Sequence, residues 1–86
     1  MLEVHLFGRS HGCSLCEGWK RKLTAAGIKF IFHDILTRDG MADMAFHNLA
    51  RVPSLVIGDQ RFEEIMPADM KTDDLIALVN EGKVRI

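Results

Sequence analysis

The first part of the chain alternates between a strand-like and a helix-like pattern of hydrophobic positions. Residues 2–8 alternate apolar and polar side chains and predict a β-strand. Residues 14–26 have the periodicity of an α-helix, and Gly27 is a suitable residue to end it. The apolar positions of this helix are Leu15, Cys16, Trp19, Leu23 and Ala26. Residues 29–35 are rich in aromatic and β-branched side chains, so the chain begins with a predicted strand–helix–strand unit.

A second helix is predicted after this unit. Asp39 and Gly40 open a helical stretch that extends to about residue 50. Its predicted inner face consists of Met41, Met44, Ala45 and Leu49. We expect both methionines to pack in the core, because the flexible methionine side chain fills irregular gaps well.

A hairpin and a third helix complete the predicted elements. Residues 55–57 predict a third strand, which a Gly-Asp turn connects to a fourth strand over residues 60–63. Residues 73–81 predict the last helix, with Thr72 as its N-cap and Gly82 as its stop. The apolar stripe of that helix consists of Leu75, Leu78 and Val79.

This order of elements predicts one α/β domain over residues 1–86, arranged βαβ-α-ββα, with a four-stranded mixed sheet flanked by helices. The composition, 48% hydrophobic and 27% charged, is typical of a soluble globular domain. A formal net charge of −1 gives no reason to expect a nucleic-acid or anionic-membrane partner. The sequence has neither a secretory hydrophobic region nor a run long enough to span a bilayer, so we expect a cytoplasmic protein. We also expect a monomer.

Two cysteines, Cys13 and Cys16, lie at the predicted junction between the first strand and the first helix. A cysteine at a helix start faces unpaired backbone N–H groups and the positive end of the helix dipole, which favour a thiolate. Cys16 shares a helix face with Trp19 and Leu23, so we expect its sulfur to be buried and that of Cys13 to meet solvent. The spacing therefore indicates dithiol–disulfide chemistry, in which Cys13 attacks and Cys16 resolves the mixed disulfide.

With this Cys-x-x-Cys and this element order, the chain resembles the glutaredoxin-like branch of the thioredoxin superfamily. A second motif that supports the resemblance is Val52-Pro53, immediately before the third strand. The resemblance implies that Pro53 follows a cis peptide bond and packs beside the two sulfurs, and that the backbone of Val52 pairs with the substrate chain. The alternative is that Pro53 merely begins an edge strand, where a missing N–H does no harm.

The chain departs from the usual glutaredoxin sequence at several places. Ser14 and Leu15 separate the cysteines in place of Pro-Tyr, so the reduction potential is not implied by the resemblance. Glycines usually precede the last helix of glutathione-using members, but here Met70 and Lys71 do so. The helix start at Thr72 and Asp73 can still receive a carboxylate through backbone N–H groups. Arg9 and Arg51 stand near the positions of the family's basic residues. The sequence therefore leaves open whether glutathione is a co-substrate. We expect no tightly bound cofactor.

Two other functions remain open from the sequence. The first is metal binding, either as an iron–sulfur cluster shared between chains or as a zinc site completed by histidines. The four histidines are His5, His11, His33 and His47. No second Cys-x-x-C and no closely spaced histidine pair accompanies the cysteines, which disfavours a closed zinc site. The second is an adaptor that keeps the fold without the redox task. The leading hypothesis is an oxidoreductase acting on a protein disulfide or a glutathione mixed disulfide, with no resident metal.

Overall fold

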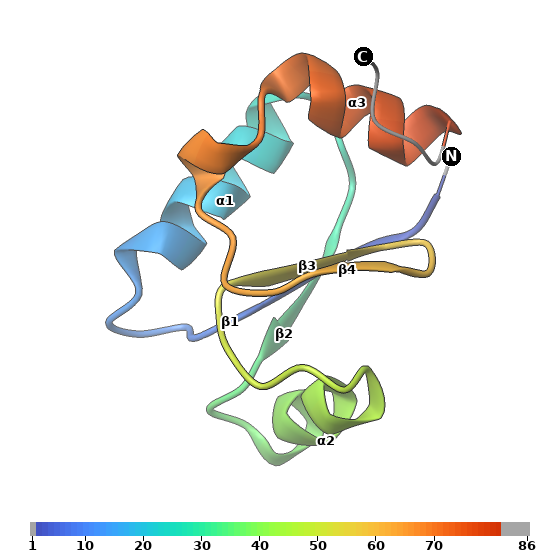
Figure 1. Cartoon of the computed structure of the whole chain (residues 1–86). Helices are drawn as coiled ribbons and strands as arrows, with labels where there is room; N and C mark the ends of the chain where they lie inside the picture. The colour runs from blue at the N-terminus through green and yellow to red at the C-terminus, as the bar shows by residue number, and fades with distance from the viewer. Residues whose placement is uncertain (1, 82–86) are drawn as a thin grey trace.

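The computed structural model describes residues 2–81, which form one mixed sheet with helices on both faces (Figure 1). The strands are β1 (Val4–Gly8), β2 (Ile31–Asp34), β3 (Ser54–Ile57) and β4 (Gln60–Phe62). The helices are α1 (Ser14–Ala25), α2 (Arg38–Phe46), the short 3₁₀ helix η1 (Pro67–Asp69) and α3 (Thr72–Glu81). The sheet order is β2-β1-β3-β4, in which only the β1–β2 pair is parallel. The predicted βαβ-α-ββα order and mixed sheet are confirmed.

The sheet separates two hydrophobic clusters. Helices α1 and α3 cover one face and α2 lies on the other, as Figure 1 shows. The larger cluster, beneath α1 and α3, includes Val4, Leu6, Trp19, Leu23, Leu55, Ile57, Leu75 and Leu78. The smaller cluster, beneath α2, consists of Phe7, Met44, Leu49 and Val56. Because side chains alternate along a strand, β1 sends Val4 and Leu6 to the larger cluster, and the ring of His5 contacts that of Phe7 on the opposite side.

Helix α1 follows the predicted pattern except at its ends. It ends at Ala25, and Gly27 adopts a positive φ of 72°, a conformation that glycine reaches without a steric penalty. Cys16, Trp19 and Leu23 are fully buried and form the inner stripe. Leu15 was wrongly assigned to that stripe, because it precedes Cys16 by one residue, in the first turn, and is 38% exposed.

The predicted inner face of α2 is only partly correct. Met44 is buried, but Ala45 is exposed and Met41 is 58% exposed. The helix starts at Arg38 and ends at Phe46, so Leu49 is buried from the segment after the helix. The cause is Gly40: a Cβ at this position would lie 1.9 Å from the carbonyl oxygen of Asp34. Because of this close approach, the helix face that carries Gly40 and Met44 packs against the sheet, and Met41 faces solvent.

Several other boundaries differ from the prediction: β1 begins at Val4, β3 begins at Ser54 and β4 ends at Phe62. Strand β2 covers only residues 31–34. Helix α3 begins at Thr72, and the N–H of Leu75 donates to the carbonyl of Lys71, so Lys71 takes the N-cap position that was predicted for Thr72. The predicted stop at Gly82 lies outside the described residues. No helix within residues 2–81 is long and apolar enough to cross a membrane.

Candidate active site

The cysteine pair lies at the start of α1, just after the loop that follows β1. Cys13 is the N-cap residue of α1, with extended backbone angles, and its Sγ accepts a hydrogen bond from the N–H of Cys16 at 3.2 Å. The first helical hydrogen bond, from the N–H of Glu17 to the carbonyl of Cys13, closes the turn at 3.2 Å. Cys13 and Cys16 form a disulfide, with their Cα atoms 5.3 Å apart. The N-terminal turn of α1 thus brings both sulfurs into bonding contact.

The two cysteines differ in exposure in the predicted direction. Cys16 has no exposed surface, because it continues the stripe of Trp19 and Leu23 into the core. Cys13 is partly exposed at the helix end. The predicted burial of Cys16 is confirmed, and an attacking group from solvent meets the Cys13 side of the disulfide first.

A glycine at the end of β1 makes room for the buried sulfur. A Cβ at Gly8 would lie 2.5 Å from the Sγ of Cys16 and 3.4 Å from the ring of Phe32. The sulfur therefore sits directly against the backbone of β1, next to an aromatic ring from β2. Neither Gly8 nor Phe32 was among the predicted site residues. A glycine within a strand often marks a close approach of another group, and this was the available signal for Gly8.

Asp34 anchors the loop that leads to the cysteines. Its Oδ1 accepts hydrogen bonds from the N–H of Ser10 at 3.2 Å and of Leu36 at 3.0 Å. Hydrogen bonding with the Ser10 side chain, and then with the backbone of Leu36, lowers the pKa of Asp34 from its ordinary value of 3.8. The carboxylate at the end of β2 thus ties the β1–α1 loop to the β2–α2 loop.

The Val52-Pro53 motif lies at the same end of the sheet. The peptide bond between these residues is cis, as the resemblance implied. Ser54 pairs with Phe7, so Pro53, one residue earlier, lies at the end of β1 that Gly8 forms. Strand β3 lies between β1 and β4, so the edge-strand alternative for Pro53 is wrong.

A short hydrogen-bond path joins Pro53 to the helix that carries the cysteines. The N–H of Ile65 donates to the carbonyl of Pro53 at 3.1 Å. The indole N–H of Trp19 in turn donates to the carbonyl of Ile65 at 2.7 Å. The backbone of Ile65 thus links the cis-proline segment to Trp19 of α1, three residues after Cys16.

Comparison with known proteins agrees with this geometry. No protein-family model and no curated protein sequence matches the chain. NrdH-redoxin from Escherichia coli, a glutaredoxin-like protein with a thioredoxin-like activity profile, superposes with a TM-score of 0.60 at 17% identity, over 76% of this chain and 86% of that one. A glutaredoxin from Archaeoglobus fulgidus superposes with a TM-score of 0.63 at 22% identity, over 80% and 82% of the two chains. The fold is glutaredoxin-like.

The predicted polar residues lie in three separate segments of the fold. Arg9 is exposed just after β1, and Thr72 and Asp73 are exposed in the first turn of α3. Arg51 forms an exposed ion pair with Glu64 at 2.8 Å, and this hydrogen bond raises the pKa of the Arg51 guanidinium. Within the described part of the chain, no hydrogen bond or ion pair joins these four predicted residues to the cysteines. Their substrate roles therefore stay predictions.

The start of α3 is held by α1. The ammonium group of Lys22 donates to the carbonyl of Pro67 at 2.5 Å and also to the carbonyl of Met70. Gly18 lets the ring of Pro67 approach, because a Cβ there would lie 3.1 Å from its Cγ. The segment before Thr72 is thus fixed against the middle of α1.

Metal ligands are the remaining question at this site. Among residues 2–81, no group of three or more His, Cys, Asp or Glu side chains is arranged to hold a metal ion. Three of the four histidines that the sequence offered as extra ligands lie elsewhere: the rings of His5, His33 and His47 gather around Phe7 on the α2 side of the sheet. His11 is exposed in the loop before Cys13.

Proposed function

We propose that the chain is a thiol–disulfide oxidoreductase that works through the Cys13–Cys16 pair. One observation carries the proposal: a partly exposed sulfur at a helix N-cap is bonded to a fully buried sulfur three residues later. Disulfide exchange needs one accessible thiolate and one resolving thiol within bonding reach, and this pair supplies both. The glutaredoxin-like fold supports the same assignment.

The reaction begins from the dithiol form. The Cys13 thiolate attacks one sulfur of a substrate disulfide, so a mixed disulfide forms and the other substrate sulfur leaves as a thiolate. The helix N-terminus assists because the Cys16 N–H, directed at the Cys13 sulfur, and the helix dipole both favour negative charge there. Cys16 is buried and cannot be reached first by a bulky substrate.

The second step releases the substrate. The Cys16 thiolate attacks the Cys13 sulfur of the mixed disulfide, the second substrate sulfur leaves, and the Cys13–Cys16 disulfide forms. Two electrons pass from the protein to the substrate. Two equivalents of reduced glutathione, or a reductase, then return the protein to the dithiol form by the same exchange chemistry.

The cis-proline segment is proposed to hold the substrate chain. Within residues 2–81, the backbone of Val52 takes part in no hydrogen bond, although it directly precedes Pro53 at the end of the sheet. An extended substrate segment can pair with these backbone groups as an added strand. Arg9 and Arg51 would attract acidic groups of the substrate, and the α3 start at Thr72 and Asp73 would receive a glutathione carboxylate.

The setting of this activity is proposed from the same reasoning. Substrates would be protein disulfides or glutathione mixed disulfides, met by a monomer in the cytoplasm. A reducing compartment suits a pair that must return to the dithiol after each turnover. The neighbour with a thioredoxin-like activity profile supports testing a thioredoxin-type reductase alongside glutathione as the electron donor.

Single cysteine variants test the proposal. With a fluorescent peptide disulfide as substrate, Cys13→Ser should abolish reduction, since no accessible nucleophile remains. Cys16→Ser should still attack and should accumulate the mixed disulfide, which intact-protein mass spectrometry detects. Ser14→Ala is a matched control between the two cysteines and should retain activity. Full activity of a folded Cys13→Ser protein would overturn the assignment.

A further inference from the structure

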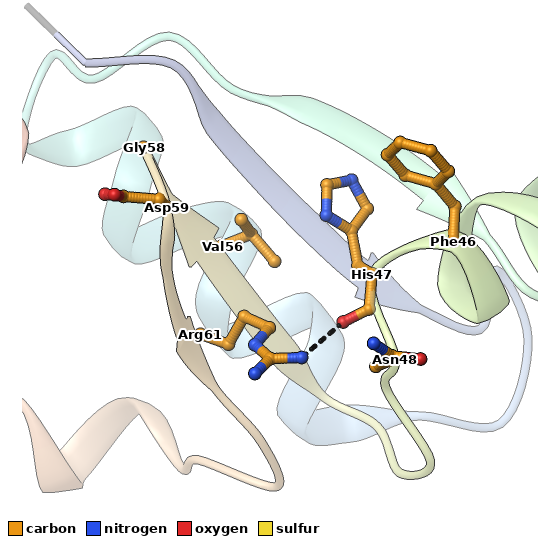
Figure 2. A pocket seen from close by; sticks show the side chains of 7 residues that line it. All are labelled: Phe46, His47, Asn48, Val56, Gly58, Asp59 and Arg61. Carbon is orange, nitrogen blue, oxygen red and sulfur yellow. Dashed lines mark hydrogen bonds between the residues drawn. The ribbon is translucent and has the colours of Figure 1, made fainter.

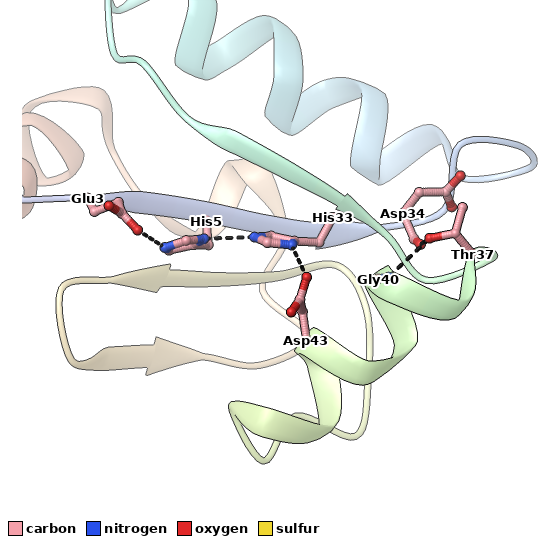
Figure 3. Close-up of polar contacts among 7 residues, drawn as sticks. All are labelled: Glu3, His5, His33, Asp34, Thr37, Gly40 and Asp43. Atoms are coloured by element: carbon pink, nitrogen blue, oxygen red, sulfur yellow. Dashed lines mark hydrogen bonds and ion pairs between the residues drawn. The ribbon is translucent and has the colours of Figure 1, made fainter.

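Four ionisable side chains form a continuous hydrogen-bonded chain on the sheet face opposite α1 and α3, as Figure 3 shows. A carboxylate oxygen of Glu3 lies 2.5 Å from Nε2 of His5. Nδ1 of His5 lies 2.7 Å from Nε2 of His33, and Nδ1 of His33 lies 3.0 Å from Oδ2 of Asp43. The chain thus runs from β1 through β2 to α2.

The geometry fixes how many protons the two rings hold. A carboxylate only accepts hydrogen bonds, so Nε2 of His5 and Nδ1 of His33 must each carry a proton. One of the two facing nitrogens must donate to the other, so exactly one more proton lies between the rings. The pair therefore holds three ring protons and one positive charge, placed between the carboxylates of Glu3 and Asp43.

Any other proton count breaks a contact. A fourth proton makes both facing nitrogens donors and puts two imidazolium rings side by side. With only two protons, two lone pairs face each other, unless one ring changes its tautomer and gives up its carboxylate. Both ring side chains are largely buried, with 16% and 14% of their surfaces exposed, so water only partly replaces a lost partner.

The last contact of the chain bears on how α2 is held. Within the described residues, His33–Asp43 is the ion pair between α2 and the sheet. Asp43 is adjacent to Met44, which is the residue of α2 that packs into the smaller cluster with Phe7. Loss of the Asp43–His33 contact therefore acts directly on the packing of Met44, which holds α2 against the sheet.

The other charged groups near the chain are few and identifiable. The ring of His47, just after α2, lies 5.6 Å from that of His5 between ring centres. From β4, Arg61 donates to the carbonyl of His47 at 3.0 Å. His47 and Arg61 line an open groove of about 320 Å³, together with Phe46, Asn48, Val56, Gly58 and Asp59. Figure 2 shows the seven lining residues.

We propose that the Glu3–His5–His33–Asp43 chain is a proton-controlled latch that holds α2 against the sheet while the two rings share one proton. A fourth proton opens the latch as the pH falls, because both facing nitrogens then become donors. Because the segment after α2 leads to Val52-Pro53, opening also loosens the support of the cis-proline segment. The latch does not depend on the proposed oxidoreductase activity, since neither cysteine takes part in it.

The proton count is measured directly on the wild-type chain. Two-dimensional NMR of the ring nitrogens of ¹⁵N-labelled protein distinguishes protonated from unprotonated nitrogen. At neutral pH the rings of His5 and His33 should together show three protonated nitrogens. Two or four protonated nitrogens would overturn the proposal without any variant being made.

Hydrogen exchange tests whether the latch holds α2. Between about pH 7 and about pH 5, the protection of the α2 amides, corrected for intrinsic exchange, should fall about tenfold, whereas that of α1 should not change. In His5→Asn, the amide can either donate to or accept from His33, so the fall should shrink to less than about twofold. His11 is an exposed loop histidine that does not belong to the Glu3–His5–His33–Asp43 latch. The variant His11→Asn is therefore the matched control and should respond as the wild type does. An unchanged pH response in folded His5→Asn would refute the latch.

Discussion

Replacing Gly8 by alanine tests whether the buried sulfur needs the space that glycine leaves. The added Cβ would lie 2.5 Å from the Sγ of Cys16, whereas ordinary contacts begin at 3.4 Å, so the sulfur or the strand must move by about 0.9 Å. Overpacking of this size costs about 1–3 kcal/mol. In the disulfide form, the bond to Cys13 prevents the Cys16 side chain from rotating away, but in the dithiol form the side chain can turn.

The cost should therefore fall mainly on the disulfide form. Destabilising that form by about 1–3 kcal/mol raises the reduction potential by roughly 20–65 mV, toward a more oxidising protein. Equilibration against glutathione buffers, with trapping of free thiols, measures this shift. Gly18→Ala is the control: its Cβ meets Pro67 and no sulfur, so the potential should stay unchanged. A Gly8→Ala protein with the wild-type potential and wild-type stability would refute the close packing of Cys16 on β1.

Three further substitutions address the supports of the site. Gly40→Ala should destabilise the protein by about 3 kcal/mol in urea unfolding, because the Cβ would meet backbone atoms of Asp34, whereas the same change at an exposed helical glycine stabilises by about 1 kcal/mol. Trp19→Phe should cost roughly 1–3 kcal/mol, because the carbonyl of Ile65 loses its donor; an unchanged urea midpoint would contradict the role of that hydrogen bond. The lowered pKa of Asp34 means that its contribution to stability is complete above pH 3.8 and is lost as the pH falls through the lower folded-state pKa. The difference in Tm between wild type and Asp34→Asn should therefore stay constant above pH 3.8 and shrink below it.

Much of the fold was readable from the sequence because its larger cluster follows simple periodicity. The Cys16, Trp19 and Leu23 stripe has helical spacing and is buried as predicted. The short apolar run of β3 forms a strand, also as predicted. The placement of the cysteines at a helix start was predictable because it depends on a local motif, whereas the cis peptide bond before Pro53 was implied by the resemblance to glutaredoxins.

The parts that were missed depend on contacts between different elements of the fold. Gly8 is required because α1 places a sulfur on it, and a glycine within β1 indicates a close approach without indicating which group approaches. The outward turn of Met41 follows from the contact of Gly40 with the end of β2, which overrides the apolar character of the methionine. Hydrophobic periodicity describes one element at a time and does not contain these distances.

The buried histidines on the α2 side of the sheet explain why the hydrophobic pattern of α2 gave a partly wrong inner face. A hydrophobic–polar reading counts histidine as polar, yet His5 and His33 are largely buried, and the ring of His33 stacks on Phe7 with 4.4 Å between ring centres. Their ring nitrogens find partners among the four ionisable side chains Glu3, His5, His33 and Asp43, so the rings can pack as core aromatics. A helix seated on such a surface needs a carboxylate and a glycine more than it needs an apolar stripe. Helix α2 has both, at Asp43 and Gly40, and for this reason its stability should respond to pH while that of the face beneath α1 and α3 should not.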